Sequence, residues 1–220
     1  MLMDAASVSD TTLHRIGRMR QHQVSMRSYV PPTPFELAGV RTSVHRNAEI
    51  YGEGEPAVHL YRVISGIVRT CRFLIDGRRQ IGGFYLPGDT FGLETTAEHK
   101  FSAEAVTDVD VLVIKTGEPS LQLWDLLGRE LRRTQDHVLL LAKTAPERVA
   151  TFLLDMARRI RSRDEVELPM SRQDIADYLG LTIETVSRTL TQLENTSAIA
   201  LPTSKRVLLR NLAALKRLNS

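Results

Sequence analysis

A glycine between two short amphipathic segments places the tightest constraint on how this chain can fold. Ser171 can cap the start of a helix, with Asp174 three residues later as in a capping box, and Gly180 supplies the left-handed residue that ends it. Thr182 then caps a second helix. Apolar residues recur at helical spacing on one face of each segment: Ile175, Ala176 and Leu179 in the first, and Ile183, Val186, Leu190 and Leu193 in the second. The pattern predicts a helix-turn-helix from Ser171 to Asn195.

The outward face of the second helix carries three side chains that can read base pairs. Glu184, Ser187 and Arg188 stand at i, i+3 and i+4, so they project the same way from its first turns. Glutamate accepts a hydrogen bond from cytosine, arginine donates two to guanine, and serine can contact a base between them. A simple surface ion pair between Glu184 and Arg188 is the alternative. We expect sequence-specific binding of double-stranded DNA, because the first turns of a recognition helix contact base edges.

A polar, basic turn follows the second helix. The strand-like segments Ile199–Leu201 and Val207–Leu209 flank it, which predicts a wing beside the helix-turn-helix. We expect DNA phosphates to lie against the tip of this wing and the starts of the two helices. The candidate phosphate contacts are Arg172, Thr182, Thr185, Thr203, Lys205 and Arg206.

An apolar seam marks the middle of the chain. Its residues recur with the spacing 3,4,3,4,3,4: Trp124, Leu127, Leu131, Thr134, Val138, Leu141 and Ala145. This heptad pattern predicts a long helix over residues 118–145, closed by Pro146, and favours pairing with a second copy of the chain. A single buried helix in a monomer is the alternative, since three heptads are few and Thr134 suits an apolar seam poorly.

Short apolar segments separated by turns precede this helix. They are Val58–Ile64, Ile67–Leu74, Gln80–Tyr85 and Asp108–Ile114, and Asp76-Gly77 is a typical hairpin turn. The pattern predicts an antiparallel barrel or sandwich. We therefore expect four parts: a flexible N-terminal extension over residues 1–30, a β-domain over 31–117, the long helix over 118–145 and a winged helix-turn-helix over 146–220.

The net charge of +3 is unevenly distributed along the chain. Residues 1–145 hold 17 Lys and Arg against 17 Asp and Glu, whereas residues 146–220 hold 12 against 9. A basic C-terminal part suits phosphate binding. An excess of this size is also ordinary, so the charge adds little weight by itself.

Composition excludes several classes of protein and site. The lone cysteine, Cys71, excludes an internal disulfide and an iron–sulfur or zinc centre held by cysteines of one chain. No apolar run approaches the roughly 18 residues of a membrane span, and no secretory signal opens the chain, so we expect a cytoplasmic protein. No phosphate loop, metal-spaced cluster or nucleophile elbow is present, so we do not expect an enzyme.

Several segments together resemble the CRP/FNR superfamily of bacterial transcription regulators, and most closely its FixK-type branch. They are Leu179–Leu190 in the recognition segment, and Tyr51–Gly54, Tyr61–Gly66 and Leu86–Gly92 in the β-domain; the resemblance covers about residues 35–215. It implies an α+β fold with an N-terminal antiparallel β-roll of the cyclic-nucleotide-binding kind, a long dimerisation helix and a C-terminal winged helix. It further implies a homodimer that binds a palindromic TTGAT-type site, mostly as an activator that contacts RNA polymerase.

Two positions depart from the cyclic-nucleotide binders of this superfamily. Those proteins place a glutamate on the ribose hydroxyls and an arginine on the phosphate, whereas this chain has Leu93 and Phe101 at the matching positions. Leu93 cannot accept a hydrogen bond, and Phe101 would leave a buried phosphate unpaired. We therefore expect no cyclic nucleotide, and no cofactor.

Control by an unidentified ligand, or by oxidation of Cys71, is the alternative within this class. Arg69 and Arg72 flank the cysteine and could lower the pKa of its thiol, which favours the reactive thiolate. A buried structural cysteine is the other interpretation. His45, His59 and His99 are scattered, which is more typical of structural histidines than of haem ligands.

Overall fold

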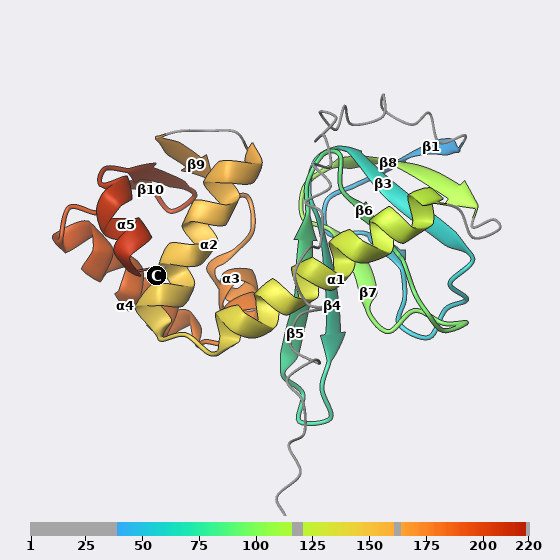
Figure 1. Ribbon diagram of the computed structural model, residues 1–220, viewed down its shortest axis with the longest axis horizontal. Helices are drawn as coiled ribbons and strands as arrows, with labels where there is room; N and C mark the ends of the chain where they lie inside the picture. The colour runs from blue at the N-terminus through green and yellow to red at the C-terminus, as the bar shows by residue number, and fades with distance from the viewer. Residues whose placement is uncertain (1–38, 116–120, 161–163, 219–220) are drawn as a thin grey trace, which may run out of the picture. The chain divides into compact units, whose positions relative to one another are not determined.

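A computed structural model of the chain describes residues 39–115, 121–160 and 164–218 (Figure 1). The predicted N-terminal extension, residues 1–30, lies outside these ranges. Strands form the first part of the described chain, and helices with one small sheet form the second. The mixed α+β class and the antiparallel β-roll predicted from the sequence are therefore confirmed.

The roll consists of two antiparallel sheets with the strand orders β1-β8-β3-β6 and β2-β7-β4-β5. The strands are β1 (Val40–Val44), β2 (Glu49–Tyr51), β3 (His59–Ser65), β4 (Val68–Phe73), β5 (Arg79–Tyr85), β6 (Thr90–Phe91), β7 (Ser102–Ala105) and β8 (Val109–Lys115). The predicted Asp76-Gly77 hairpin joins β4 to β5, with Gly77 at φ 81°. A bulge in β4 at Thr70 and Cys71 places both of these side chains inside.

Aromatic side chains fill the interior of the roll. The ring of Tyr61 lies 5.2 Å from the rings of both Tyr51 and Phe91, and the Tyr85 ring lies 5.3 Å from that of Phe91. His99 stacks on Tyr51 with ring centroids 3.7 Å apart. These rings bury large apolar areas and exchange edge and face contacts, so they stabilise the roll as a packed core.

The long helix is shorter than the heptad pattern predicted. Helix α1 (Leu121–Leu141) ends in a tight turn, in which the backbone N–H of Ala142 donates to Leu139 and that of Lys143 to Leu140. Helix α2 (Ala145–Ile160) then begins with Ala145 and Pro146. Proline favours the first turn of a helix, where its missing N–H has no partner to lose. Pro146 thus starts a helix instead of closing one, and Ala145 belongs to α2 and not to the seam of α1.

The roll holds both helices through one aspartate in the turn before β6. Asp89 accepts the backbone N–H of Leu86 at 2.8 Å, and it forms ion pairs with Arg133 of α1 and Arg159 of α2. The Arg133 guanidinium also lies 4.4 Å from the centre of the Tyr85 ring. Charge-assisted hydrogen bonds of this kind fix side-chain geometry, so they set where the helices leave the roll.

The C-terminal part is a winged helix-turn-helix. Its further elements are β9 (Glu165–Glu167), α3 (Arg172–Leu179), α4 (Ile183–Asn195), β10 (Ile199–Thr203), β11 (Arg206–Leu209) and α5 (Leu212–Leu218). Strands β10 and β11 form the predicted wing, and β9 pairs with β11 as a third strand that the sequence did not indicate. Helix α5 was also not predicted. No described helix combines the length and the apolar run that a membrane crossing needs.

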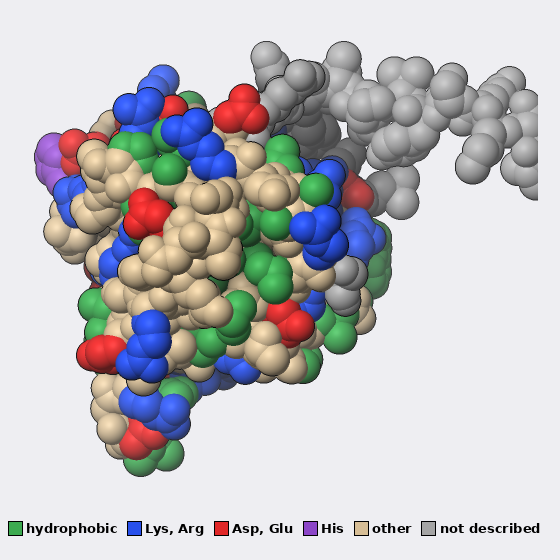
Figure 2. Space-filling model, turned by 90° about the vertical axis from the view of Figure 1, so that its left-hand side faces the viewer, with side chains coloured by type: hydrophobic (Ala, Val, Ile, Leu, Met, Phe, Trp, Pro, Cys, Tyr) green, Lys and Arg blue, Asp and Glu red, His purple; other side chains and the backbone are tan. Residues whose placement is uncertain are grey.

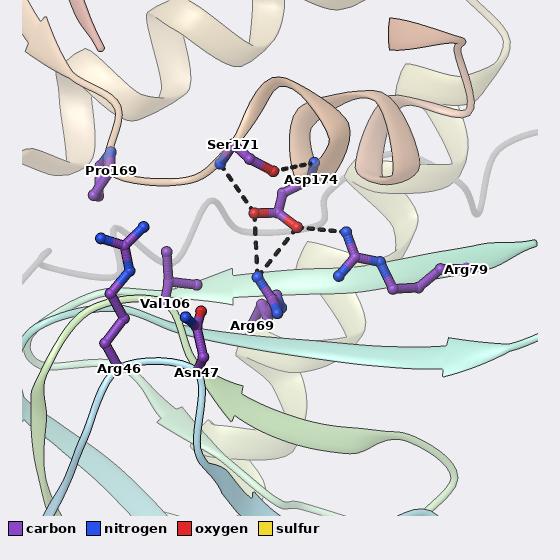
Figure 3. A pocket seen from close by; sticks show the side chains of 8 residues that line it. All are labelled: Arg46, Asn47, Arg69, Arg79, Val106, Pro169, Ser171 and Asp174. Carbon is purple, nitrogen blue, oxygen red and sulfur yellow. Dashed lines mark hydrogen bonds and ion pairs between the residues drawn. The ribbon is translucent and has the colours of Figure 1, made fainter.

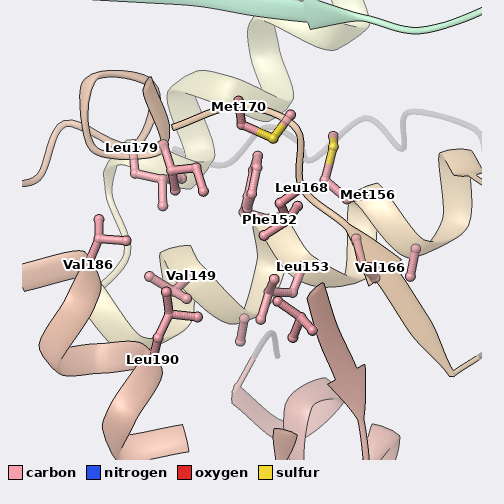
Figure 4. Packing of buried hydrophobic residues seen from close by; sticks show 14 of the residues in the cluster. Val149, Phe152, Leu153, Met156, Val166, Leu168, Met170, Leu179, Val186 and Leu190 are labelled. Atoms are coloured by element: carbon pink, nitrogen blue, oxygen red, sulfur yellow. The ribbon is translucent and has the colours of Figure 1, made fainter. Parts of the chain in front are cut away.

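One apolar core joins the elements of this domain (Figure 4). Phe152 and Leu153 of α2 pack in the same cluster as Val166 of β9, Leu179 of α3 and Leu190 of α4. All five are at least 98% buried. Burying a large apolar side chain contributes roughly 1.5–3 kcal/mol, so this core holds α3 and α4 at a fixed angle.

The structure confirms the predicted caps of the helix-turn-helix. Ser171 accepts the backbone N–H of Asp174 at 3.0 Å, and the Asp174 carboxylate accepts that of Ser171 at 3.0 Å. Gly180 is left-handed at φ 60°, and Thr182 caps α4 by accepting the N–H of Thr185 at 3.2 Å. Ile183 differs from its prediction: it is 37% exposed and does not face inward.

Two glycine-to-alanine substitutions should change stability in opposite directions. Gly180→Ala should lower the free energy of unfolding by about 1–2 kcal/mol, because a Cβ is disfavoured at positive φ and would lie 3.3 Å from Leu141. Gly128→Ala, inside α1, should raise it by up to about 1 kcal/mol, because its nearest neighbour is the flexible end of Arg132 at 3.9 Å. Urea unfolding checks both; equal effects would contradict the role given to the Gly180 turn.

Candidate nucleic-acid interface

The first turns of α4 present the three predicted base-reading residues on one exposed face. Glu184, Ser187 and Arg188 are all exposed, whereas Val186 and Leu190 between and beyond them are buried in the core. The spacing that predicted a common face is therefore realised. Burial of the opposite side orients these side chains away from the domain.

The Glu184 carboxylate is held ionised at this surface. Hydrogen bonds from its own backbone N–H and from the Thr182 hydroxyl, followed by the charge of Arg188, lower its pKa below the ordinary value. Within the described chain no ion pair closer than 4.0 Å joins Glu184 to Arg188. The simple ion pair considered from the sequence is thus absent there, and Arg188 keeps its donors available.

Two threonines occupy the start of α4, as predicted. Thr182 is exposed and Thr185 is half-buried, and their hydroxyl oxygens lie 3.1 Å apart. Both lie at the positive end of the helix dipole, which favours a nearby phosphate.

The wing tip carries Thr203, Lys205 and Arg206, all exposed. The Thr203 hydroxyl accepts the backbone N–H of Lys205 at 3.3 Å, which closes the turn. Arg206 is not a free cation. Its guanidinium donates hydrogen bonds to both carboxylate oxygens of Glu165 on β9, one of them at 2.7 Å. A phosphate can recruit Arg206 only by replacing Glu165, whereas Lys205 needs no such exchange.

Arg172, the remaining predicted phosphate contact, is partly withdrawn from solvent. Its side chain is half-buried, and its Nη1 is buried without a hydrogen-bond partner in the described part of the chain. Burial lowers the pKa of its guanidinium. Arg172 lies at the start of α3, as predicted. Its side chain is less exposed than that of Lys205.

The predicted seam of α1 is largely exposed. Trp124, Leu131 and Val138 have 66%, 60% and 64% of their surface exposed, and Leu127 and Leu141 are half-buried. Thr134 is exposed too, and its hydroxyl donates to the backbone oxygen of Glu130 at 3.0 Å, which removes the cost of placing this polar group in an apolar seam. Large apolar side chains in a row on one face mark an interaction surface.

Asp174, which the sequence indicated only as part of a capping box, also connects the helix-turn-helix to the roll (Figure 3). Asp174 of α3 accepts from Arg69 of β4 at 3.1 and 3.2 Å and from Arg79 of β5 at 2.5 Å. Arg79 also bonds Asp177 at 2.7 Å, and Arg69 bonds Glu104 at 2.6 Å. Burial alone would raise the pKa of Asp174, but its hydrogen bonds to Ser171 and the two arginines together lower it.

The structure weakens the premise of a reactive Cys71. The side chain is buried, and burial raises the pKa of its thiol to about 11, with a further contribution from Glu104. Arg69 and Arg79 lower it by less. The thiol, and not the thiolate, is therefore the form at neutral pH. Among the described residues, no three His, Cys, Asp or Glu side chains form a group that could hold a metal ion.

On the face drawn in Figure 2, positive charge is not concentrated in one patch. Figure 2 shows the molecule from the left-hand side of Figure 1, and the Lys and Arg side chains are spread over this face among acidic ones. The geometry of α4 and the wing, and not bulk charge, therefore carries the case for a nucleic-acid interface.

Comparison with known proteins decides the family. Residues 147–218 match the Crp-like helix-turn-helix domain, and residues 41–119 match the cyclic nucleotide-binding domain. The nitrogen fixation regulation protein FixK of Azorhizobium caulinodans is 53% identical, over 94% of this chain and 90% of that protein. The chain belongs to the CRP/FNR family of transcription regulators. It is a FixK-like, DNA-binding transcription regulator, as the sequence resemblance predicted.

Two further relatives support the same placement in the CRP/FNR family. The transcriptional activatory protein AadR of Rhodopseudomonas palustris is 42% identical, over 72% of this chain and 73% of that protein. The solved structure of FixK2 from Bradyrhizobium japonicum matches with a TM-score of 0.78 and 46% identity, over 84% of this chain and 98% of that chain.

The roll of this CRP/FNR regulator does not fit a cyclic nucleotide, although it matches that domain. Leu93 and Phe101 offer neither a hydroxyl acceptor nor a phosphate partner. Arg72 lies over the Phe101 ring at 5.8 Å, but an ion pair to Glu53 at 3.1 Å engages it. The aromatic core occupies the interior of the roll.

Removing the charge of Asp174 should destabilise the protein and change its response to acid. Asp174→Asn should lower the free energy of unfolding by about 3 kcal/mol, because it leaves Arg69 and Arg79 without their buried partner. Since the folded-state pKa is lowered, the stabilisation is complete above the ordinary value of 3.8 and is lost as the pH falls below it. Unfolding measured at neutral and acidic pH should show that the free energy of unfolding falls less in acid for the variant than for the wild type.

Asp125→Asn is the matched control for this substitution. Asp125 pairs with Arg129 one turn along α1, and both side chains are at least half exposed. Such a pair contributes up to about 0.5 kcal/mol. Equal losses for the two variants would show that the Asp174 network is not the link between the two domains.

Proposed function

We propose that this chain is a homodimeric transcription activator that binds a palindromic TTGAT-type site and needs neither a cyclic nucleotide nor an iron–sulfur cluster. One observation carries the proposal: Glu184, Ser187 and Arg188 form an exposed common face at the start of the second helix of a winged helix-turn-helix. These are the turns that enter the major groove in this class of domain.

The chemistry of the three side chains suits one G·C pair and its neighbour. Arg188 donates two hydrogen bonds to guanine, and Glu184 accepts from a cytosine. Ser187, between them, packs near a thymine methyl. Lys205 and the threonines at the start of α4 contact phosphate, and Arg206 joins them by exchanging Glu165 for phosphate.

The exposed seam of α1 supplies the dimer contact in this proposal. A row of large apolar side chains with most of its surface in water is costly in a monomer, and a second α1 would cover it by heptad packing. Leu139, with 65% of its surface exposed, widens the face beyond the seam. A two-fold dimer then presents two recognition helices to two half-sites about one helical turn apart.

The proposal that the protein activates transcription rests on the names of its relatives and not on the geometry of this chain. AadR is named a transcriptional activatory protein, and Anr of Pseudomonas aeruginosa, 36% identical over 69% of this chain, a transcriptional activator. We propose that the surface of the roll contacts RNA polymerase. Transcription in vitro from a promoter with a selected site tests this part by itself.

Selection of bound sequences from random DNA by the purified protein, with nothing added, tests the DNA-binding proposal. Recovery of a palindrome with TTGAT-like half-sites is the expected result. A requirement for added cyclic AMP, or recovery of sequences without symmetry, would contradict it.

Arg188→Ala should remove discrimination at one base pair. The expected loss is about 1–3 kcal/mol per half-site on the preferred operator, with little further loss when the guanine is replaced. Affinities for single-base operator variants, measured at fixed salt, give this matrix. Lys205→Ala is the matched control: it should weaken all operators alike and reduce the salt dependence by about one ion. If Arg188→Ala behaves like Lys205→Ala, Arg188 only contacts phosphate.

Acidic substitutions in the α1 seam should separate the subunits. Leu131→Glu with Val138→Glu places like charges against their symmetry mates in an apolar interface, so sedimentation should detect a monomer with a folded roll. Arg132→Glu adds an exposed acid one residue beyond the seam and should leave the dimer intact. A double variant that still sediments as a dimer would show that another surface pairs.

A further inference from the structure

A cavity of about 230 Å³ lies where the roll meets the start of α3 (Figure 3). The turn before β2 contributes Arg46 and Asn47 to its lining, β4 and β5 contribute Arg69 and Arg79, and α3 contributes Asp174. A single water needs roughly 10–15 Å³ of such space, so there is room for a phosphate or a four-carbon dicarboxylate. It lies outside the aromatic interior of the roll.

The lining offers more unused donors than unused acceptors. Both carboxylate oxygens of Asp174 already accept hydrogen bonds, from Ser171 and the two arginines. In contrast, no hydrogen bond or ion pair engages the Arg46 guanidinium within the described residues, and Nη1 of Arg79 is likewise unengaged there. Arg69 and Arg79 are paired with Asp174, Glu104 and Asp177, whereas the Arg46 guanidinium has no such partner among the described residues. An unpaired guanidinium beside a free Arg79 Nη1 favours an anionic guest with several oxygens.

Asn47 adds a neutral donor in an uncommon backbone conformation. Its φ is 63°, and its backbone N–H is bonded to Ala105 at 2.8 Å, which fixes the turn. Figure 3 shows its carboxamide directed into the space between the roll and α3. Asparagine tolerates this conformation better than most residues, and such backbone outliers gather at ligand sites.

We propose that this cavity binds a small dianionic oxyanion, either a phosphate group or a short dicarboxylate. Arg46 and Asn47 bind its outer oxygens, and Arg79 binds an inner one through its free Nη1. The anion competes with Asp174 for Arg69 and Arg79, so its binding loosens the connection between the β4–β5 hairpin and α3. The expected effect of the anion on DNA binding rests on the function proposed above, whereas binding of the anion to the free protein does not.

Calorimetry on the whole protein without DNA tests the site directly. The probes are inorganic phosphate and succinate, each up to about 10 mM at constant ionic strength, and they distinguish the two sources of the anion. We expect at least one to bind, and Arg46→Gln to weaken it about tenfold. Among the described residues Arg46 has no side-chain partner to lose, so the variant should fold like the wild type. No heat from either probe would overturn the proposal.

Arg41→Gln is the matched control. Arg41 is an exposed arginine five residues away that pairs with Asp110 at 2.7 Å and does not line the cavity. It should bind the anion as the wild type does. Equal affinity of the wild type and Arg46→Gln would place the anion elsewhere and overturn the proposal.

Operator binding with and without the anion tests the coupling. The anion should weaken operator affinity about threefold or more in the wild type and in Arg41→Gln, but not in Arg46→Gln, and bound operator should weaken the anion by the same factor. An equal effect in all three proteins would mean that the anion competes at the DNA surface, which would overturn the coupling. If the wild type binds the anion but no DNA, the proposed function is refuted and the proposal of an anion site is still supported.

Discussion

The position of the helix-turn-helix against the roll depends on one buried carboxylate. Asp174 closes the capping box of α3 and at the same time neutralises Arg69 and Arg79, which reach it from the roll. A buried charge is stable only while its partners remain, so neither the cap nor the arginines can move independently. The start of the helix-turn-helix is thereby fixed both to its own backbone and to the β4–β5 hairpin.

Asp89 plays the corresponding part for the long helices. It bonds the backbone of its own turn and pairs with Arg133 and Arg159, so a single carboxylate of the roll holds both α1 and α2. One side of α1 is thus fixed to the roll while Leu131 and Val138 remain in solvent on the other. A helix fixed on one side and apolar on the other offers a rigid surface for association, at a smaller entropic cost than a flexible one.

Local chemistry explains what the sequence predicted correctly. The caps at Ser171 and Thr182 join residues three positions apart, and the Gly180 N–H donates to Ala176 four positions back, so local spacing alone specifies them. The Arg69–Asp174 contact joins residues 105 positions apart, and no local pattern indicates it. A periodic pattern also misses what breaks it: the turn after Leu141 removed Ala145 from the seam, and the bulge in β4 placed the adjacent Thr70 and Cys71 on the same side of the strand.

The roll contacts the helix-turn-helix through its outer surface and not through its interior. The interior is filled by Tyr51, Tyr61 and Phe91, so a ligand there would have to displace a packed core. The outside of the same roll still reaches α3 through Arg69 and Arg79. Any signal that changes the charge around these arginines acts directly on the start of the helix-turn-helix. If the anion proposed above binds at this contact, control of DNA binding would need no cavity inside the roll.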